Sequence, residues 1–151
     1  MNIAIASAAT DDLNAMADLL YELFTLESDF KPERDKQLRG LRQILDNPQI
    51  GQLFVLRVDG VVAGMANALI TMSTAEGRAV VLLEDVIVKA AFRGQKLGRK
   101  LVEHVFDWAA RAGMPRVTLL ADKDNAPALA FYERLGFEPS AMRVLRKTLA
   151  T

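Results

Sequence analysis

The chain of 151 residues contains no cysteine and a single histidine. The absence of cysteine excludes a thiolate zinc site, an iron–sulfur cluster, a disulfide framework and any reaction through a cysteine thioester. With only one histidine remaining, we expect no bound metal. A chain of this length buries about 70% of its unfolded surface, so it can fold around one core without such cross-links. We therefore expect a single domain that spans residues 1–151.

An excess of charge is also absent, because 19 basic side chains balance 19 acidic ones. This neutrality argues against a general nucleic-acid partner. No apolar run approaches the roughly 20 residues that cross a bilayer, and the first residues lack the basic region of a signal peptide. The sequence therefore predicts a cytoplasmic protein without a nucleic-acid or membrane partner.

Hydrophobic periodicity predicts the element order β α α β β β α β α β. The Asp59-Gly60 pair between two apolar stretches is a strong hairpin signal. Antiparallel strands followed by a β-helix-β unit predict a mixed α/β (α+β) fold whose sheet is mostly antiparallel with one parallel pair. We expect strands at 2–8, 52–58, 61–72, 79–88, 115–121 and 142–149, and helices at about 11–24, 38–47, 97–112 and 125–135.

The most informative stretch is a strand that turns into a helix whose start contains Gly94 and Gly98. Backbone N–H groups at a helix N-terminus bind phosphate, and glycine lets the ligand approach the main chain. Cations at that end oppose the helix dipole by about 0.3–1 kcal/mol each, which predicts a negative ligand. The alternative is a solvated basic helix start, and the spacing fits neither a P-loop nor a dinucleotide fingerprint. The basic residues concerned are Arg93, Lys96, Arg99 and Lys100.

Two motifs together resemble the GNAT superfamily of acyl-CoA-dependent N-acyltransferases. They are Val86-Ile87-Val88 with Arg93-Gly94-Gln95-Lys96-Leu97-Gly98, and downstream Asn125-x-x-Ala128-x-x-Phe131-Tyr132-x-x-x-Gly136-Phe137. The resemblance implies helices on both faces of the sheet and acetyl-CoA as co-substrate. The chain departs from the family pattern at Lys96, where the middle glycine of the motif usually stands. We expect this lysine to be tolerated in the first helical turn without an unusual backbone angle.

The resemblance also implies which residues hold the coenzyme. The backbone of Val86, Ile87 and Val88 would pair with the pantetheine arm as though it were an added strand, where two strands splay apart. Asn125 would hydrogen-bond the pantetheine, although an ordinary helix N-cap is the alternative for this residue. The pyrophosphate would lie against the turn and first helical residues Arg93, Gly94, Gln95, Lys96, Leu97, Gly98 and Arg99.

Glu84 and Asp85 are adjacent acids in an otherwise apolar strand, and alternation predicts that they point to opposite faces. The resemblance implies that Glu84 is the base, directly or through water, with a structural ion pair as the alternative. It likewise implies that the Tyr132 phenol hydrogen-bonds the leaving thiolate, with a core tyrosine as the alternative. No histidine lies near a serine in the sequence that could carry the acyl group, so direct attack in a ternary complex is expected. The serines considered are Ser7, Ser28, Ser73 and Ser140.

The predicted function is thus transfer of an acetyl group from acetyl-CoA to a primary amine of a small molecule or a protein. The alternative is a non-catalytic acyl-CoA-binding module, which would need neither Glu84 nor Tyr132. By analogy with the family, the acceptor would contact the loop between the first two helices, and a homodimer is a family-level expectation. The acids of that loop are Glu27, Asp29, Glu33 and Asp35. The loop also holds Lys31, Arg34 and Lys36, so a solvated turn of mixed charge is the alternative.

Overall fold

The computed structural model describes residues 1–27 and 31–151, and the chain divides into two compact units. The first unit is Met1–Leu120 and the second is Ala121–Thr151. Each unit is described by itself below. None of the helices in the described ranges is long and apolar enough to span a membrane.

The first unit contains one five-stranded sheet with the strand order β1-β2-β3-β4-β5. The first four strands are antiparallel to their neighbours, and β5 pairs in parallel with β4. Asp59 and Gly60 make the predicted hairpin turn with φ angles of 50° and 84°. The mostly antiparallel sheet with one parallel pair is therefore confirmed. The strands are β1 (Ile3–Ser7), β2 (Gly51–Val58), β3 (Val61–Ser73), β4 (Arg78–Val88) and β5 (Val117–Leu119).

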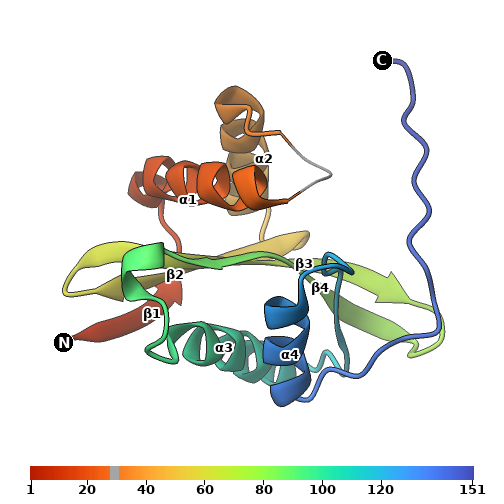
Figure 1. Ribbon diagram of the computed structural model, residues 1–151. Coiled ribbons are helices and arrows are strands. Elements are labelled where there is room, and N and C mark those ends of the chain that lie inside the picture. The colour runs from red at the N-terminus through yellow and green to blue at the C-terminus, as the bar shows by residue number, and fades with distance from the viewer. Residues whose placement is uncertain (28–30) are drawn as a thin grey trace. The chain divides into compact units, whose positions relative to one another are not determined.

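Helices cover both faces of this sheet (Figure 1). The helices α1 (Leu13–Leu26) and α2 (Arg34–Asp46) lie on one face, and α3 (Leu97–Arg111) lies on the other. Their apolar stripes at spacings of three and four face the sheet, which is why these stretches are helical. The predicted mixed fold with helices on both faces is confirmed.

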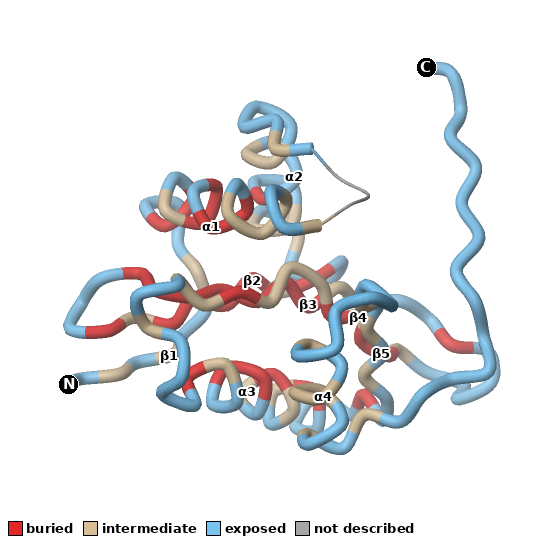
Figure 2. Tube along the Cα trace, viewed as in Figure 1, coloured by how far each residue is buried: buried red, intermediate tan, exposed pale blue. Residues whose placement is uncertain are grey.

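Alternation along β2 supplies both layers of the core. Leu53 and Val55 pack with Met16 of α1 in one buried cluster. Phe54, which points to the opposite face, meets the rings of His104 and Trp108 of α3 at centroid distances of 5.2 and 5.5 Å. The buried residues accordingly follow the central strands and the sheet-facing sides of the helices (Figure 2).

The second unit contains a single helix, α4 (Ala126–Arg134). Asn125 is its N-cap, and its Oδ1 accepts a hydrogen bond from the backbone N–H of Ala128 at 3.2 Å. The strand predicted at 142–149 is wrong, because residues 137–151 form no helix or strand and Leu145 is 92% exposed. A strand needs a neighbour for its backbone hydrogen bonds, and this unit, all of which is described, contains no other strand.

Candidate functional site

The strand β4 loses one of its two neighbours after Leu83. From Val81 to Leu83, β4 pairs with β3 on one edge and with β5 on the other, where the last pair is Leu83 with Leu119. The Ile87 carbonyl oxygen faces β3, so close that a β-carbon added to Gly64 would lie 3.1 Å from it. Alternation then directs the backbone groups of Val86 and Val88 to the edge that β5 leaves open. Of the three residues predicted to pair with pantetheine, these two present their backbone there.

Arg93 already occupies part of that edge. Its Nε donates to the Val88 carbonyl oxygen at 2.9 Å, and its Nη2 donates to Oε1 of Glu22 on α1 at 2.9 Å. The Arg93 side chain therefore ties α1 to the end of β4 instead of extending freely toward solvent. A ligand that adds to this edge has to share or displace the bond to Val88.

The turn before α3 has two residues in the left-handed region, Gly94 with φ 80° and Lys96 with φ 60°. The expectation that Lys96 needs no unusual backbone angle is wrong. A left-handed conformation costs a residue with a β-carbon about 1–2 kcal/mol, which explains why this position of the motif usually holds glycine. A β-carbon on Gly94 would meet nothing within 4 Å, so the backbone of the turn is open on that side.

The N-terminus of α3 has free backbone donors. Lys96 is the N-cap residue, but no side chain caps the helix. The first backbone bond is made by Lys100, whose N–H donates to the Lys96 carbonyl oxygen at 3.3 Å. The N–H groups of Leu97, Gly98 and Arg99 precede that bond and form the positive end of the helix dipole. With Gly94 and the exposed Gln95 before it, this turn suits a pyrophosphate.

The positive charge at this helix start is smaller than the sequence suggests. Arg93 pairs with Glu22, and Arg99 pairs with Glu103 at 3.4 Å. Among the described residues, Lys96 and Lys100 are the cations of the group that form no ion pair. The positive charge available to an anionic ligand at this helix start thus comes from two lysines.

A β-bulge changes the positions of Glu84 and Asp85. Asn67 of β3 pairs with Glu84 while Met65 pairs with Ile87, so β4 carries one residue more than β3 over this interval. Asp85 is the extra residue of the bulge, and its φ angle is 54°. The prediction that alternation sends the two acids to opposite faces is wrong: Glu84 lies beside its pairing partner Asn67, and Asp85 accepts a hydrogen bond from the same side chain.

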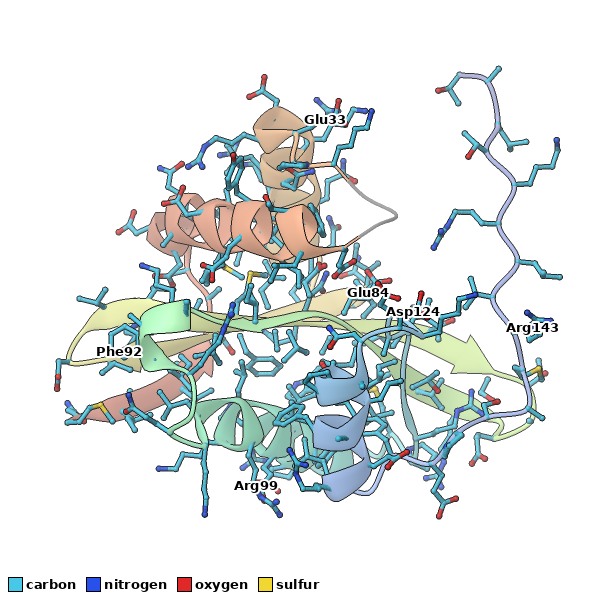
Figure 3. All side chains as sticks on the ribbon, in the orientation of Figure 1. Glu33, Glu84, Phe92, Arg99, Asp124 and Arg143 are labelled. Carbon is cyan, nitrogen blue, oxygen red and sulfur yellow. The ribbon has the colours of Figure 1, made fainter. Side chains whose placement is uncertain are left out.

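Figure 3 shows Glu84 on the face of the sheet that α1 and α2 cover. Asp85 is hydrogen-bonded to Asn67, the pairing partner of Glu84. Burial raises the pKa of Glu84, and the neighbouring Asp85 carboxylate raises this pKa further. Burial also raises the pKa of Asp85, although the hydrogen bond from Asn67 opposes that shift. A carboxyl group with a raised pKa in a partly buried position is a candidate for proton transfer.

Sequence reasoning missed Asn67, which is only 4% exposed. Its Nδ2 donates to Oδ2 of Asp85 at 3.1 Å. No donor among the described residues reaches its Oδ1. The available signal was an amide residue within the apolar run from Val61 to Ile70, where a polar side chain needs a partner.

The remaining predicted residues lie elsewhere in the chain. Tyr132 and Asn125 belong to the second unit, where the Tyr132 ring packs against Phe131 and Phe137 at 5.0 and 5.6 Å. In the loop predicted to contact the acceptor, Glu33 forms an ion pair with Lys36 at 2.8 Å, and this contact lowers the pKa of Glu33. Asp29 and Ser28 lie outside the described residues. No group of three or more potential metal-ligating side chains occurs in residues 1–27 and 31–151.

Comparison with known proteins identifies the family of this chain. The sequence model described as the Acetyltransferase (GNAT) family matches residues 13–137. The chain belongs to the GNAT family. This match confirms the family and the enzyme class, an acyltransferase, that the sequence motifs predicted.

Individual GNAT relatives share about a quarter of the sequence. An uncharacterized N-acetyltransferase of Methanocaldococcus jannaschii is 27% identical over 89% of this chain and 60% of its own length. The aminoalkylphosphonate N-acetyltransferase of Salmonella typhimurium is 27% identical over 90% of this chain and 85% of its own length. The structure of an aminoglycoside N-acetyltransferase in complex with CoA has the same fold, with a TM-score of 0.83, 22% identity and coverage of 99% of this chain and 96% of that chain.

Proposed function

We propose that this protein transfers the acetyl group of acetyl-CoA to a primary amine by direct attack in a ternary complex, with residues 1–151 acting as one catalytic domain. The observation that carries the proposal is the second half of β4, where a bulge with two acids adjoins an open strand edge that leads into an uncapped helix. The family match from residue 13 to residue 137 includes parts of both units, which supports a single domain.

The coenzyme would bind along the open edge and the turn. Val86 and Val88 would bond the amide groups of pantetheine in the manner of an added strand. The pyrophosphate would receive the N–H groups of the turn and first helical residues, with charge supplied by Lys96. Asn125 already uses Oδ1 to cap α4, so its Nδ2 would be the group that donates to pantetheine.

The reaction would use Glu84 as base and Tyr132 as hydrogen-bond donor. Acetyl-CoA supplies the thioester carbonyl that the amine attacks. Glu84, whose raised pKa favours proton uptake, takes the proton that the substrate ammonium loses before attack, directly or through a water molecule. Tyr132 donates to the departing sulfur as the new C–N bond replaces the C–S bond. The nitrogen loses its second proton as the C–N bond forms, and this proton ends on the departing sulfur. The products are therefore one amide and one free thiol, and no acyl-enzyme is required.

The test combines coenzyme binding with thiol release. Titration calorimetry with CoA should show binding to the wild type, and a panel of primary amines with acetyl-CoA should release thiol. The Glu84→Gln and Tyr132→Phe variants should bind CoA normally and lose thiol release, by about 10²–10⁴-fold for the base. Ser140→Ala is a matched control that should retain full activity, since no acyl-serine is formed.

Three outcomes contradict the proposal. If calorimetry detected no heat with CoA, the proposed coenzyme site would be contradicted. Thiol release that is equal in the wild type, Glu84→Gln and Tyr132→Phe would assign these residues no catalytic role. Normal CoA binding with no release from any amine would favour the non-catalytic binding module.

A further inference from the structure

The side chain of Asn67 has an unused hydrogen-bond acceptor inside the protein. The residue is 4% exposed, and Oδ1 meets no donor among the described residues. Its Nδ2, bound to the same carbon atom, donates to Asp85 at 3.1 Å. Leaving a buried polar atom unpaired costs about 1–3 kcal/mol, so this oxygen calls for a donor that the described chain does not supply.

Two carboxyl groups adjoin this oxygen without a cation of their own. Glu84 is the pairing partner of Asn67 across the bulge, and Asp85 is bonded to its amide. Neither acid forms an ion pair within the described residues, whereas Asp12, which is also buried, is held by Arg57 at 2.8 Å. The bulge therefore gathers three oxygen-bearing groups that accept hydrogen bonds and lacks the matching positive charge.

We propose that Asn67 and Asp85 are specificity-determining residues that, together with Glu84, hold the primary ammonium group of the acceptor at the β4 bulge. The inference rests on the proposed function and deepens it by assigning the residues that recognise the acceptor. A primary ammonium has three N–H donors, which equals the number of groups offered by Asn67 Oδ1, Asp85 and Glu84. A secondary amine has one donor fewer and an alcohol carries no charge, so both leave an acceptor unsatisfied.

The arrangement also places the bound amine for reaction. Asn67 and Asp85 would fix the nitrogen, and Glu84 would take the proton that the ammonium must lose before attack. Recognition and proton removal are thereby divided between different residues of one bulge. Variants of Asn67 and Asp85 should mainly raise the KM for the amine, whereas the Glu84→Gln variant should mainly lower kcat.

The test compares n-butylamine, N-methylbutylamine and 1-butanol as acceptors for acetyl-CoA. The wild type should prefer the primary amine, and the Asn67→Leu and Asp85→Asn variants should raise its KM about 10-fold or more with an unchanged CoA affinity. The preference for the primary over the N-methyl amine should fall in both variants. Ser73→Ala, which removes another buried polar side chain from β3, is the control and should leave all of these values unchanged.

A binding measurement separates this inference from the proposed function. Ligand-observed NMR titration of n-butylammonium needs no turnover, and its binding should be lost in Asp85→Asn, a substitution that keeps the shape of the side chain. Should no amine release thiol, retained ammonium binding in the wild type with loss in Asp85→Asn would support the site while the transfer reaction failed.

Two results would overturn the inference. The first is an amine KM and a primary-to-secondary preference that stay within twofold of wild type in a folded variant. The second is an absence of n-butylammonium binding to the wild type. In that case a proton shared between Asp85 and Asn67 would account for the unpaired Oδ1 of Asn67.

Discussion

The two halves of β4 differ although they belong to one strand. From Val81 to Leu83 the strand is paired on both edges, and these two residues are 0% and 2% exposed. From Glu84 to Val88 the strand bulges, has no β5 partner on one edge and contains two partly buried acids. The first half is built like a core strand and the second like a binding edge.

The difference shows how a small change in pairing converts a core strand into a candidate site. The strand β5 stops at Leu119, which exposes backbone donors and acceptors of β4 at one edge. One extra residue at Asp85 turns both acids toward the same neighbour. Backbone groups and carboxylates are costly to leave unpaired. Both features therefore indicate that this half of β4 binds a ligand and does not serve to stabilise the fold.

The largest expected effect is on stability and concerns the half of β4 that is paired on both edges. Leu83→Ala should lower the free energy of unfolding by about 2–5 kcal/mol, because it leaves a cavity in a closely packed strand. Val86→Ala, at a half-buried position of the same strand, should cost roughly 1 kcal/mol. Urea denaturation of both variants measures the contrast. Equal losses would mean that the two halves do not differ in packing.

The acidic pair makes a prediction about pH. Burial raises the pKa of Asp85 in the folded chain, so the stability linked to this group is present below the ordinary range of aspartate, near 3.9, and is lost as pH rises through its raised pKa. Asp85→Asn should therefore be more stable than the wild type at pH 7.5, and this advantage should vanish at acidic pH.

Denaturation at several pH values measures this difference. Glu33→Gln is a control of opposite sign, because Lys36 lowers the pKa of Glu33 and its contribution is present only above the ordinary glutamate range. A stability advantage of Asp85→Asn that did not change with pH would contradict the linkage to this carboxyl group.

Variants of Lys96 can distinguish the effect of its left-handed backbone conformation from the effect of its charge. Lys96→Gly should raise the free energy of unfolding by about 0.5–1 kcal/mol, because glycine adopts φ 60° without a β-carbon clash. It should also weaken CoA binding, by up to roughly fivefold, through loss of one charge. Lys100→Gln should weaken CoA binding without stabilising the fold. Calorimetry and denaturation of both variants decide whether Lys96 serves the ligand at the expense of stability.

The smallest expected effect concerns Glu22, which holds Arg93 against the open edge. Glu22→Gln should change the free energy of unfolding by less than about 1 kcal/mol, since the ion pair is largely exposed. Release of Arg93 should raise the affinity for CoA a few-fold. Asp18→Asn, which breaks the exposed pair with Arg34, should leave that affinity unchanged. A lower affinity in Glu22→Gln would show instead that the pair supports the coenzyme site.

Local patterns predicted much of this protein because they depend on near neighbours in the sequence. The Asp59-Gly60 turn, the apolar stripes of the helices and the motif from Val86 to Gly98 were readable for that reason. The strand expected at 142–149 failed because alternation describes a strand without providing its partner.

The sequence by itself determined the family and the order of most elements, and it named the segment proposed to bind the coenzyme. The tertiary structure alone decided that β5 ends before the β4 bulge, that Lys96 is left-handed, and that Asn67 joins Glu84 and Asp85. These features arise from pairing between residues far apart in the chain. A single inserted residue in one strand reverses the face of a side chain, and no local pattern records which strand carries the insertion.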